Sequence, residues 1–144
     1  MIPTRRLAGR EVGAIGLGCM TMSWGYLGDG TDEEAVRVIR RAHDLGVTHF
    51  DTADCYGPFT NELLLGEALE PFKGQVTIAT KFGFELRPDG SPGFIGLNSR
   101  PDHIREVGST MMIAGGIAIS IVVTAFALDA RIPSWARATA LLLV

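Results

Sequence analysis

The amino-acid sequence predicts an α/β fold with parallel strands, joined to a nearly uncharged C-terminal part. Strand-like and helix-like segments alternate up to residue 107, and such alternation is typical of βαβ units. Of 13 Lys+Arg and 16 Asp+Glu residues, only Asp129, Arg131 and Arg137 lie in residues 108–144. The 144 residues suffice for one ordinary domain, but not for an architecture that needs about 250 residues.

The composition excludes several classes of function. A formal net charge of −3 gives no basic patch of the kind that nucleic-acid binding requires. Cys19 and Cys55 are far apart in the sequence, so neither a zinc site nor a disulfide framework is expected. The N-terminal residues lack the apolar segment of a signal peptide, and we therefore expect the charged part to be cytoplasmic.

The first predicted unit contains the clearest helix. A glycine-rich apolar run at 11–20 predicts a strand that enters a tight loop. Thr31 and Glu34 then form the capping box of a helix, which Gly46 ends. Segment 47–50 follows as a buried strand. The apolar stripe of this helix consists of Ala35, Val38, Ile39, Ala42 and Leu45.

A second unit repeats this plan. Residues 61–70 predict a helix that stops before Pro71, and the β-branched segment 75–80 predicts a strand. Residues 83–101 contain four glycines and three prolines and predict a long loop. Residues 101–107 then begin another helical pattern.

The segment 108–128 carries no charged residue. A helix that spans a bilayer needs about 20 predominantly apolar residues, so this segment predicts a transmembrane helix. The alternative is a helix buried inside a larger protein. Residues 129–144 form a short apolar tail.

Three polar residues follow the predicted strands. Asp51 comes after strand 47–50, Lys81 ends strand 75–80, and Tyr56 lies in the loop after Asp51. The carboxyl ends of parallel strands meet at one edge of a sheet, where active sites form. An ammonium group favours loss of a neighbouring phenol proton, and a carboxylate keeps that ammonium charged, so Tyr56 becomes a candidate general acid. The alternative is that Asp51 caps a turn, Tyr56 packs against it and Lys81 is solvated; the occurrence of all three together favours the catalytic interpretation.

These residues resemble a known family. The run from Phe50 to Gly57, followed by Asn61-Glu62 and Gly66, is similar to the signature of the aldo-keto reductases. Residues 78–83 resemble the third-strand motif of that family, and residues 16–25 resemble its first-strand cofactor loop. The resemblance covers about residues 4–107. It implies the first three or so βα units of a (β/α)₈ TIM barrel, within a domain of residues 1–107, and an oxidoreductase that reduces aldehydes and ketones with NADPH.

The resemblance also implies roles for individual residues. Tyr56 would be the proton donor to the carbonyl oxygen, with Lys81 and Asp51 tuning it. Trp24 would line the pocket for a small carbonyl substrate. The NADP(H) contacts would be Gly18, Cys19, Met20 and Asp51.

The family pattern stops at about Val107. The catalytic His of the family and the loops that bind the rest of the cofactor have no counterpart, and His43, His49 and His103 lie where they cannot replace that His. We therefore expect an incomplete, inactive reductase fragment, produced by truncation, frameshift or gene fusion. The alternatives are a non-catalytic, single-pass membrane-anchored interaction module and a mispredicted reading frame that yields no stable protein. The residues that select NADP over NAD would lie in the missing part.

Overall fold

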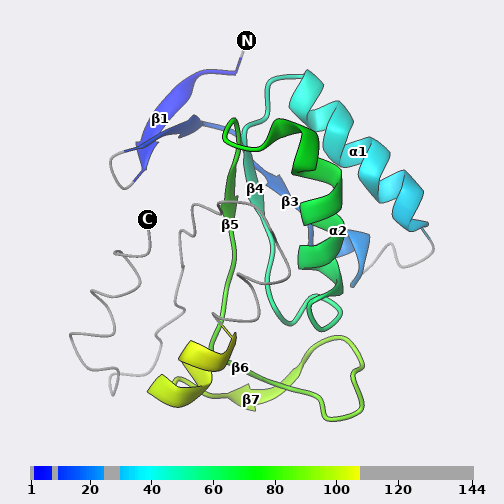
Figure 1. Ribbon diagram of the computed structural model, residues 1–144, viewed down its shortest axis with the longest axis vertical. Helices are drawn as coiled ribbons and strands as arrows, with labels where there is room; N and C mark the ends of the chain where they lie inside the picture. The colour runs from blue at the N-terminus through cyan, green and yellow to red at the C-terminus, as the bar shows by residue number, and fades with distance from the viewer. Residues whose placement is uncertain (1, 8–9, 25–29, 108–144) are drawn as a thin grey trace.

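A three-stranded parallel sheet, in the order β3–β4–β5, lies at the centre of the structure (Figure 1). The structure is a computed structural model that describes residues 2–7, 10–24 and 30–107. Strands adjacent in the sheet are also consecutive along the chain, and a helix connects each to the next, as parallel neighbours require. The predicted α/β fold is thus confirmed. The strands are β3 (Leu17–Gly18), β4 (His49–Asp51) and β5 (Thr77–Ala79).

Helix α1 (Asp32–Asp44) connects β3 to β4 and begins as predicted. The Thr31 hydroxyl accepts a hydrogen bond from the backbone N–H of Glu34 at 3.2 Å, and the Glu34 carboxylate accepts one from the Thr31 N–H at 3.1 Å. Gly46 follows the helix with a φ of 95°, a conformation that glycine adopts without steric strain. Both the capping box and the terminal glycine are confirmed.

Helix α2 (Thr60–Leu69) connects β4 to β5 and lies beside α1 on the same face of the sheet (Figure 1). It occupies the predicted range 61–70 to within one residue at each end. Helix α2 ends before Pro71, as predicted, but a short 3₁₀ helix, η2 (Glu70–Phe72), follows it directly and contains Pro71.

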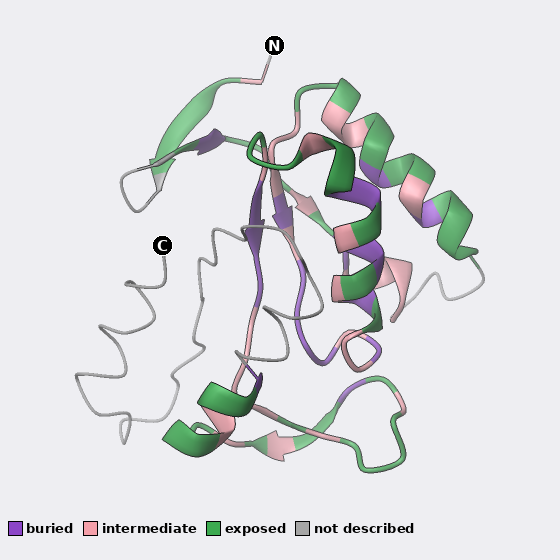
Figure 2. Ribbon diagram, viewed as in Figure 1, coloured by how far each residue is buried: buried purple, intermediate pink, exposed green. Residues whose placement is uncertain are grey.

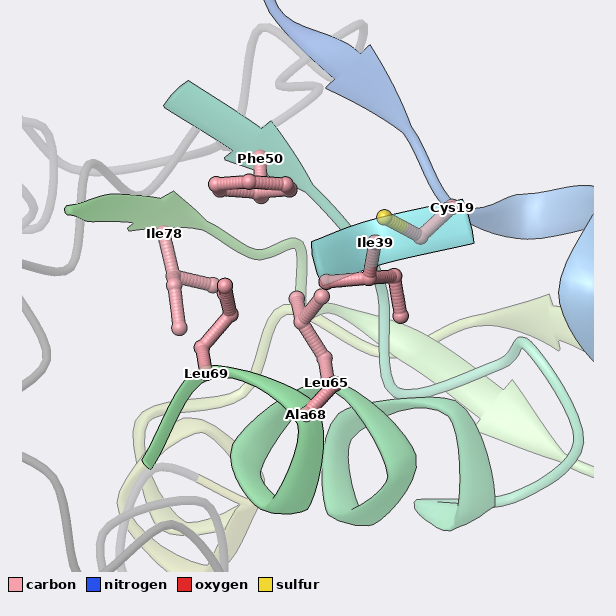
Figure 3. Close-up of a cluster of buried hydrophobic side chains, with 7 residues drawn as sticks. All are labelled: Cys19, Ile39, Phe50, Leu65, Ala68, Leu69 and Ile78. Atoms are coloured by element: carbon pink, nitrogen blue, oxygen red, sulfur yellow. The ribbon is translucent and has the colours of Figure 1, made fainter. Parts of the chain in front are cut away.

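The core lies between the sheet and the two helices. Buried residues concentrate on β5, in the loop after β4 and on one side of α2 (Figure 2). Phe50 and Ile78 project from neighbouring strands towards the helices, where they meet Ile39 of α1 and residues of α2 (Figure 3). This packing fixes which side chains of each strand point away from the helices. The buried cluster is Cys19, Ile39, Phe50, Leu65, Ala68, Leu69 and Ile78.

The predicted apolar stripe of α1 is wrong at two of its positions. Val38 is 51% exposed and Leu45 is 59% exposed, whereas Ile39 is fully buried. The helix is rotated so that Val36 packs against the core cluster in place of Val38. Since residues are spaced about 100° apart around a helix, Val38 and Leu45 then lie on the flank of the buried face.

Two antiparallel hairpins flank the central sheet, and Figure 1 shows them at opposite ends of it. The first splits the predicted 11–20 strand, because β2 pairs with β1 and stops before β3 begins. The second lies in the predicted long loop 83–101, so that prediction is wrong: the glycine- and proline-rich segment supplies only the turn between two strands. The hairpin strands are β1 (Thr4–Leu7), β2 (Arg10–Gly13), β6 (Phe84–Leu86) and β7 (Phe94–Leu97).

Residues 101–107 are helical, as predicted. Among residues 2–7, 10–24 and 30–107, no helix has the length and apolar character needed to cross a membrane. The segment 108–128, for which the sequence predicts a transmembrane helix, lies outside the described residues, as does the tail 129–144. Both stay predictions.

Candidate active site

The structure brings Asp51, Tyr56 and Lys81 together at the carboxyl ends of β4 and β5. Asp51 is the last residue of β4, and Lys81 follows the end of β5. The Lys81 ammonium donates hydrogen bonds to Asp51 Oδ1 and, at 2.9 Å, to the Thr52 carbonyl oxygen. It also lies 4.9 Å from the centroid of the Tyr56 ring. The cluster predicted from the strand ends therefore exists.

The charge of Lys81 is maintained by its partners. Its side chain is only 14% exposed, whereas that of Asp51 is 39% exposed. Burial by itself would lower the pKa of Lys81, but hydrogen bonds to Asp51 and to the Tyr56 side chain hold that pKa above its usual value. Lys81 is consequently an ammonium at neutral pH, fixed against a phenol group.

A buried hydrogen-bond network centred on Asn61 supports this cluster. The Asn61 side chain is 1% exposed. Its amide nitrogen donates to the Cys19 carbonyl oxygen at 2.9 Å and to Ser23 Oγ at 2.6 Å. Its oxygen accepts from the Thr52 hydroxyl at 2.6 Å. Ser23 Oγ in turn donates to the Tyr56 carbonyl oxygen at 2.9 Å. The network joins the loop after β3, the loop after β4 and helix α2.

Sequence reasoning missed the role of Asn61. The residue was recognised only as part of the Asn61-Glu62 pair in the family signature. The available signal was a polar amide in the first turn of a helix at a position that faces the core. A buried amide needs partners, and that requirement points to a network rather than to a surface residue.

Two further carboxyl groups lie beside the site. Asp54 is fully buried, and its backbone N–H donates to the Lys81 carbonyl oxygen at 3.4 Å. Glu62 Oε1 accepts a hydrogen bond from the Thr80 hydroxyl at 2.5 Å. Burial, and then the nearby Glu62 charge, raise the pKa of Asp54 to about 7. Burial also raises the pKa of Glu62 above its usual value.

The predicted cofactor contacts have different environments. Gly18 lies opposite Asp51 in the sheet, and a Cβ at Gly18 would have no atom within 4 Å. Met20 is half-buried in the 3₁₀ helix η1 (Met20–Met22). The Cys19 thiol, by contrast, belongs to the core cluster, and burial followed by the Asp51 charge raises its pKa to about 12. Any contact of Cys19 with a cofactor would therefore come from its backbone atoms.

Trp24 lies next to Tyr56, with ring centroids 5.9 Å apart and an interplanar angle of 37°. The β6–β7 hairpin approaches the same place, because the Gly93 N–H donates to the Cys55 carbonyl oxygen at 3.0 Å. A Cβ on Gly93 would lie 3.4 Å from the Trp24 ring. The Trp24 ring therefore lies close to both the Tyr56 ring and the Gly93 segment of the hairpin.

The three histidines of the described chain have other environments. The His43 ring stacks on Phe72 at 3.7 Å, and His103 Nε2 lies 3.0 Å from the Phe84 carbonyl oxygen. His49 lies within β4, two residues before Asp51.

Comparison with known proteins determines the family. The sequence model described as the Aldo/keto reductase family matches residues 14–112, well over half of the chain. The chain belongs to the aldo-keto reductase family. The match continues five residues past Val107, into the beginning of the uncharged segment 108–128.

Individual aldo-keto reductases show the same relationship. The NADP(+) aldo-keto reductase yakc of Schizosaccharomyces pombe is 37% identical over 107 residues, which are 73% of this chain and 31% of that protein. The holo form of an aldo-keto reductase from Bacillus halodurans superposes with a TM-score of 0.71 and 25% identity, over 85% of this chain and 40% of that chain. A glycerol dehydrogenase from Gluconobacter oxydans gives a TM-score of 0.70 and 26% identity, over 83% and 38%. The chain spans about a third of the length of the curated relatives that it matches.

Proposed function

We propose that this chain carries the proton-donating part of an NADP(H)-dependent site that reduces aldehydes and ketones. The observation that carries the proposal is the cluster of Tyr56, Lys81 and Asp51 at the carboxyl ends of β4 and β5. Membership of the aldo-keto reductase family supports the same chemistry.

Each residue of the cluster has a distinct task. Tyr56 donates its hydroxyl proton to the carbonyl oxygen of the substrate as that oxygen gains negative charge. Lys81, held charged by Asp51, stabilises the phenolate that is left. NADPH, when bound, supplies the hydride that the carbonyl carbon accepts. Hydride plus proton converts the carbonyl into an alcohol, so atoms and charges balance.

The described residues fit such a cofactor beside Asp51. The missing side chain of Gly18 leaves open space next to the Asp51 carboxylate, which is partly exposed. That carboxylate can accept hydrogen bonds from the hydroxyls of a ribose. Gly18, Met20 and Asp51 would hold the nicotinamide end of NADP(H), with the backbone of Cys19, and Trp24 would cover a small carbonyl substrate.

A chimera tests the roles of these residues in a complete barrel. Residues 14–107 of this chain would replace the matching segment of the S. pombe relative, and NADPH oxidation with 4-nitrobenzaldehyde would be followed. Tyr56→Phe should lower kcat by about 10²-fold or more, since it removes only the proton donor. Lys73 is exposed, so Lys73→Met is the matched control for Lys81→Met and should leave the rate of NADPH oxidation unchanged. Full activity of the Tyr56→Phe chimera would refute the proposal.

The chain by itself is the second arm of this experiment. We propose that it is an incomplete reductase, so the 144-residue chain should give no NADPH oxidation with the same aldehyde. Turnover that Tyr56→Phe abolishes would show instead that the isolated chain is an enzyme.

A non-catalytic, membrane-anchored module is the alternative function. It rests on the absence of charge from residues 108–128. It predicts that the full chain sediments with membranes and resists carbonate extraction, with the reductase-like part in the cytoplasm. Recovery of the full chain as a soluble monomer would exclude it.

A further inference from the structure

One flank of helix α1 is apolar and exposed. Val38 is 51% exposed and Leu45 is 59% exposed, although both are large aliphatic side chains. Ile39 marks the direction in which the helix faces the core, because it is fully buried in the core cluster. At about 100° per residue, Val38 and Leu45 both lie roughly 100–120° from Ile39 on the same side of the helix. These two residues are therefore aligned along the helix and form what we call the apolar flank.

The apolar flank faces away from α2. Arg40 lies about 100° from Ile39 on the other side of α1, and its Nε donates to the Ala68 carbonyl oxygen of α2 at 3.1 Å. His43 lies on that side too, where its ring stacks on Phe72, just after α2. Helix α2 thus covers one flank of α1, and the opposite flank is the apolar and exposed one. Figure 1 shows α1 as the outer helix of this pair.

The central sheet is open on the same side. Within residues 2–7, 10–24 and 30–107, β3 is an edge strand that pairs with β4 alone. Helix α1 follows β3 and helix α2 follows β4, so the flank of α1 that faces away from α2 lies on the β3 side. Ile15, two residues before β3, is 60% exposed. A further βα unit covers such a surface, because its strand pairs with an open edge and its helix packs beside the neighbouring helix.

We propose that the β3 edge and the apolar flank form a docking surface for a separate polypeptide that carries the remaining βα units of an aldo-keto reductase barrel. The superposition on the B. halodurans reductase covers 85% of this chain but 40% of that one, so more than half of the relative has no counterpart here. A barrel of eight parallel βα units closes by pairing its first strand with its last. Since β3 is the first parallel strand of this chain, the group that docks is the last βα unit of the barrel.

The surroundings of the apolar flank favour a protein helix as the occupant. Glu34 and Arg41 lie about 140–160° from Ile39 on the same side, so one acidic and one basic residue border the flank. An amphipathic helix meets both requirements, with apolar residues at the centre of the contact and polar residues at its rim. The uncharged segment 108–128 has no ionised group to place opposite Glu34 or Arg41. A helix from a further βα unit therefore fits this flank better than that segment does.

Thiol labelling of the full 144-residue chain measures whether the flank becomes covered. Burial raises the pKa of the Cys19 thiol to about 12 and that of the Cys55 thiol to about 11, so a maleimide reports an introduced cysteine. The partner used is the part of the S. pombe relative that follows the stretch matched by this chain. It should slow the labelling of Val38→Cys by about tenfold or more, because a buried thiol reacts only when the interface opens. Arg37→Cys is the matched control, because the Arg37 side chain is 71% exposed on the outer face of α1, and its labelling should not change.

Affinity separates the apolar flank from other exposed apolar residues. Val38→Asp should raise the Kd of the same complex by about tenfold or more, since it places an unpaired carboxylate in the interface. Leu63→Asp is the matched control, because Leu63 is 49% exposed but lies about 160° from the buried Leu65, on the outer face of α2. It should leave the Kd unchanged. Equal effects of the two substitutions would contradict the assignment to the apolar flank.

The remaining outcomes each decide one part of the proposal. No protection by the free partner would overturn docking between separate chains. In the covalent chimera described above, labelling of Val38→Cys as fast as that of Arg37→Cys would overturn the docking surface itself. Protection in the full chain alone would also overturn the proposed partner, in favour of a second copy if the chain sediments as a dimer and of its own C-terminal residues if it sediments as a monomer. The docking does not rest on the proposed function, so a complex that forms without NADPH oxidation would count against that function only.

Discussion

Replacement of Asn61 by alanine should destabilise the fold strongly, because this side chain holds three segments together. The substitution removes two hydrogen bonds that Asn61 donates and one that it accepts. Each buried hydrogen bond contributes about 1 kcal/mol net, and a partner left unsatisfied costs about 1–3 kcal/mol more. Alanine recovers roughly 0.6 kcal/mol through its higher helix propensity. With one partner left unsatisfied, the expected loss in the free energy of unfolding is about 3–5 kcal/mol.

Urea unfolding of the full chain, followed by circular dichroism, measures this loss. With a slope of about 2 kcal/mol/M, a loss of 3 kcal/mol moves the midpoint down by about 1.5 M without changing the slope. Glu67→Ala is the matched control, because it alters an exposed residue of the same helix. It should stay within about 0.5 kcal/mol of the wild type.

Asn61→Asp separates the two halves of the network. It keeps the acceptor for the Thr52 hydroxyl but loses both donors, so an ionised carboxylate would face the Cys19 carbonyl oxygen. Destabilisation should be at least as large as for Asn61→Ala at pH 7 and smaller at low pH, where the carboxyl regains a proton. A loss below about 1 kcal/mol in both variants would refute the claim that this network stabilises the site.

Three other substitutions test separate parts of the fold. Because folding raises the pKa of Asp54 from 3.8 to about 7, the native state keeps a proton that the unfolded chain releases, and stability falls by about 4 kcal/mol as pH rises across that interval. Asp54→Asn should remove that decline, so its unfolding free energy relative to the wild type should grow up to pH 7 and then level off; a constant difference would contradict this. Gly57→Ala places a Cβ 2.6 Å from a neighbouring hydroxyl at a φ of 63°, so it should lower the melting temperature more than Gly74→Ala, which has a φ of 81° but open space. Ile39→Ala should cost about 2–5 kcal/mol in urea unfolding, against about 1 kcal/mol or less for the half-exposed Val38→Ala.

Sequence patterns predicted those parts of the fold that depend on interactions between residues close together in the chain. The capping box at Thr31 and Glu34 depends on residues three apart, and the structure contains both of its hydrogen bonds. The cluster of Asp51, Tyr56 and Lys81 was also predictable, because parallel strands present their carboxyl ends at one edge. The rotation of α1 was not predictable in the same way, since packing against α2 and the sheet decides which flank is buried.

Long-range contacts account for what the sequence did not reveal. The hydrogen bond from Asn61 to Cys19 spans 42 positions, and that from Ser23 to Tyr56 spans 33. No periodicity or turn signal records such a pairing. The burial of Asp54 is similar, because a charged residue in a loop is usually exposed and only the packed structure shows that it is not. The β6–β7 hairpin was missed because glycine and proline marked its turn clearly and its short strands only weakly.

Thr52 connects the cluster of Asp51, Tyr56 and Lys81 to the buried network around Asn61. Its carbonyl oxygen accepts a hydrogen bond from Lys81, while its hydroxyl donates to Asn61. The position of the Lys81 ammonium therefore depends on the Thr52 backbone, and Thr52 is itself fixed by the hydrogen bond from its hydroxyl to Asn61. Asn61 also donates a hydrogen bond to the Cys19 carbonyl oxygen. It therefore stabilises both the proposed cofactor loop after β3 and, through Thr52, the position of the Lys81 ammonium. A substitution that displaces either the cofactor loop or the Lys81 ammonium should therefore displace the other through Thr52 and Asn61. The partly exposed site at the sheet edge thus depends on residues that are almost completely buried, namely Cys19, Thr52 and Asn61.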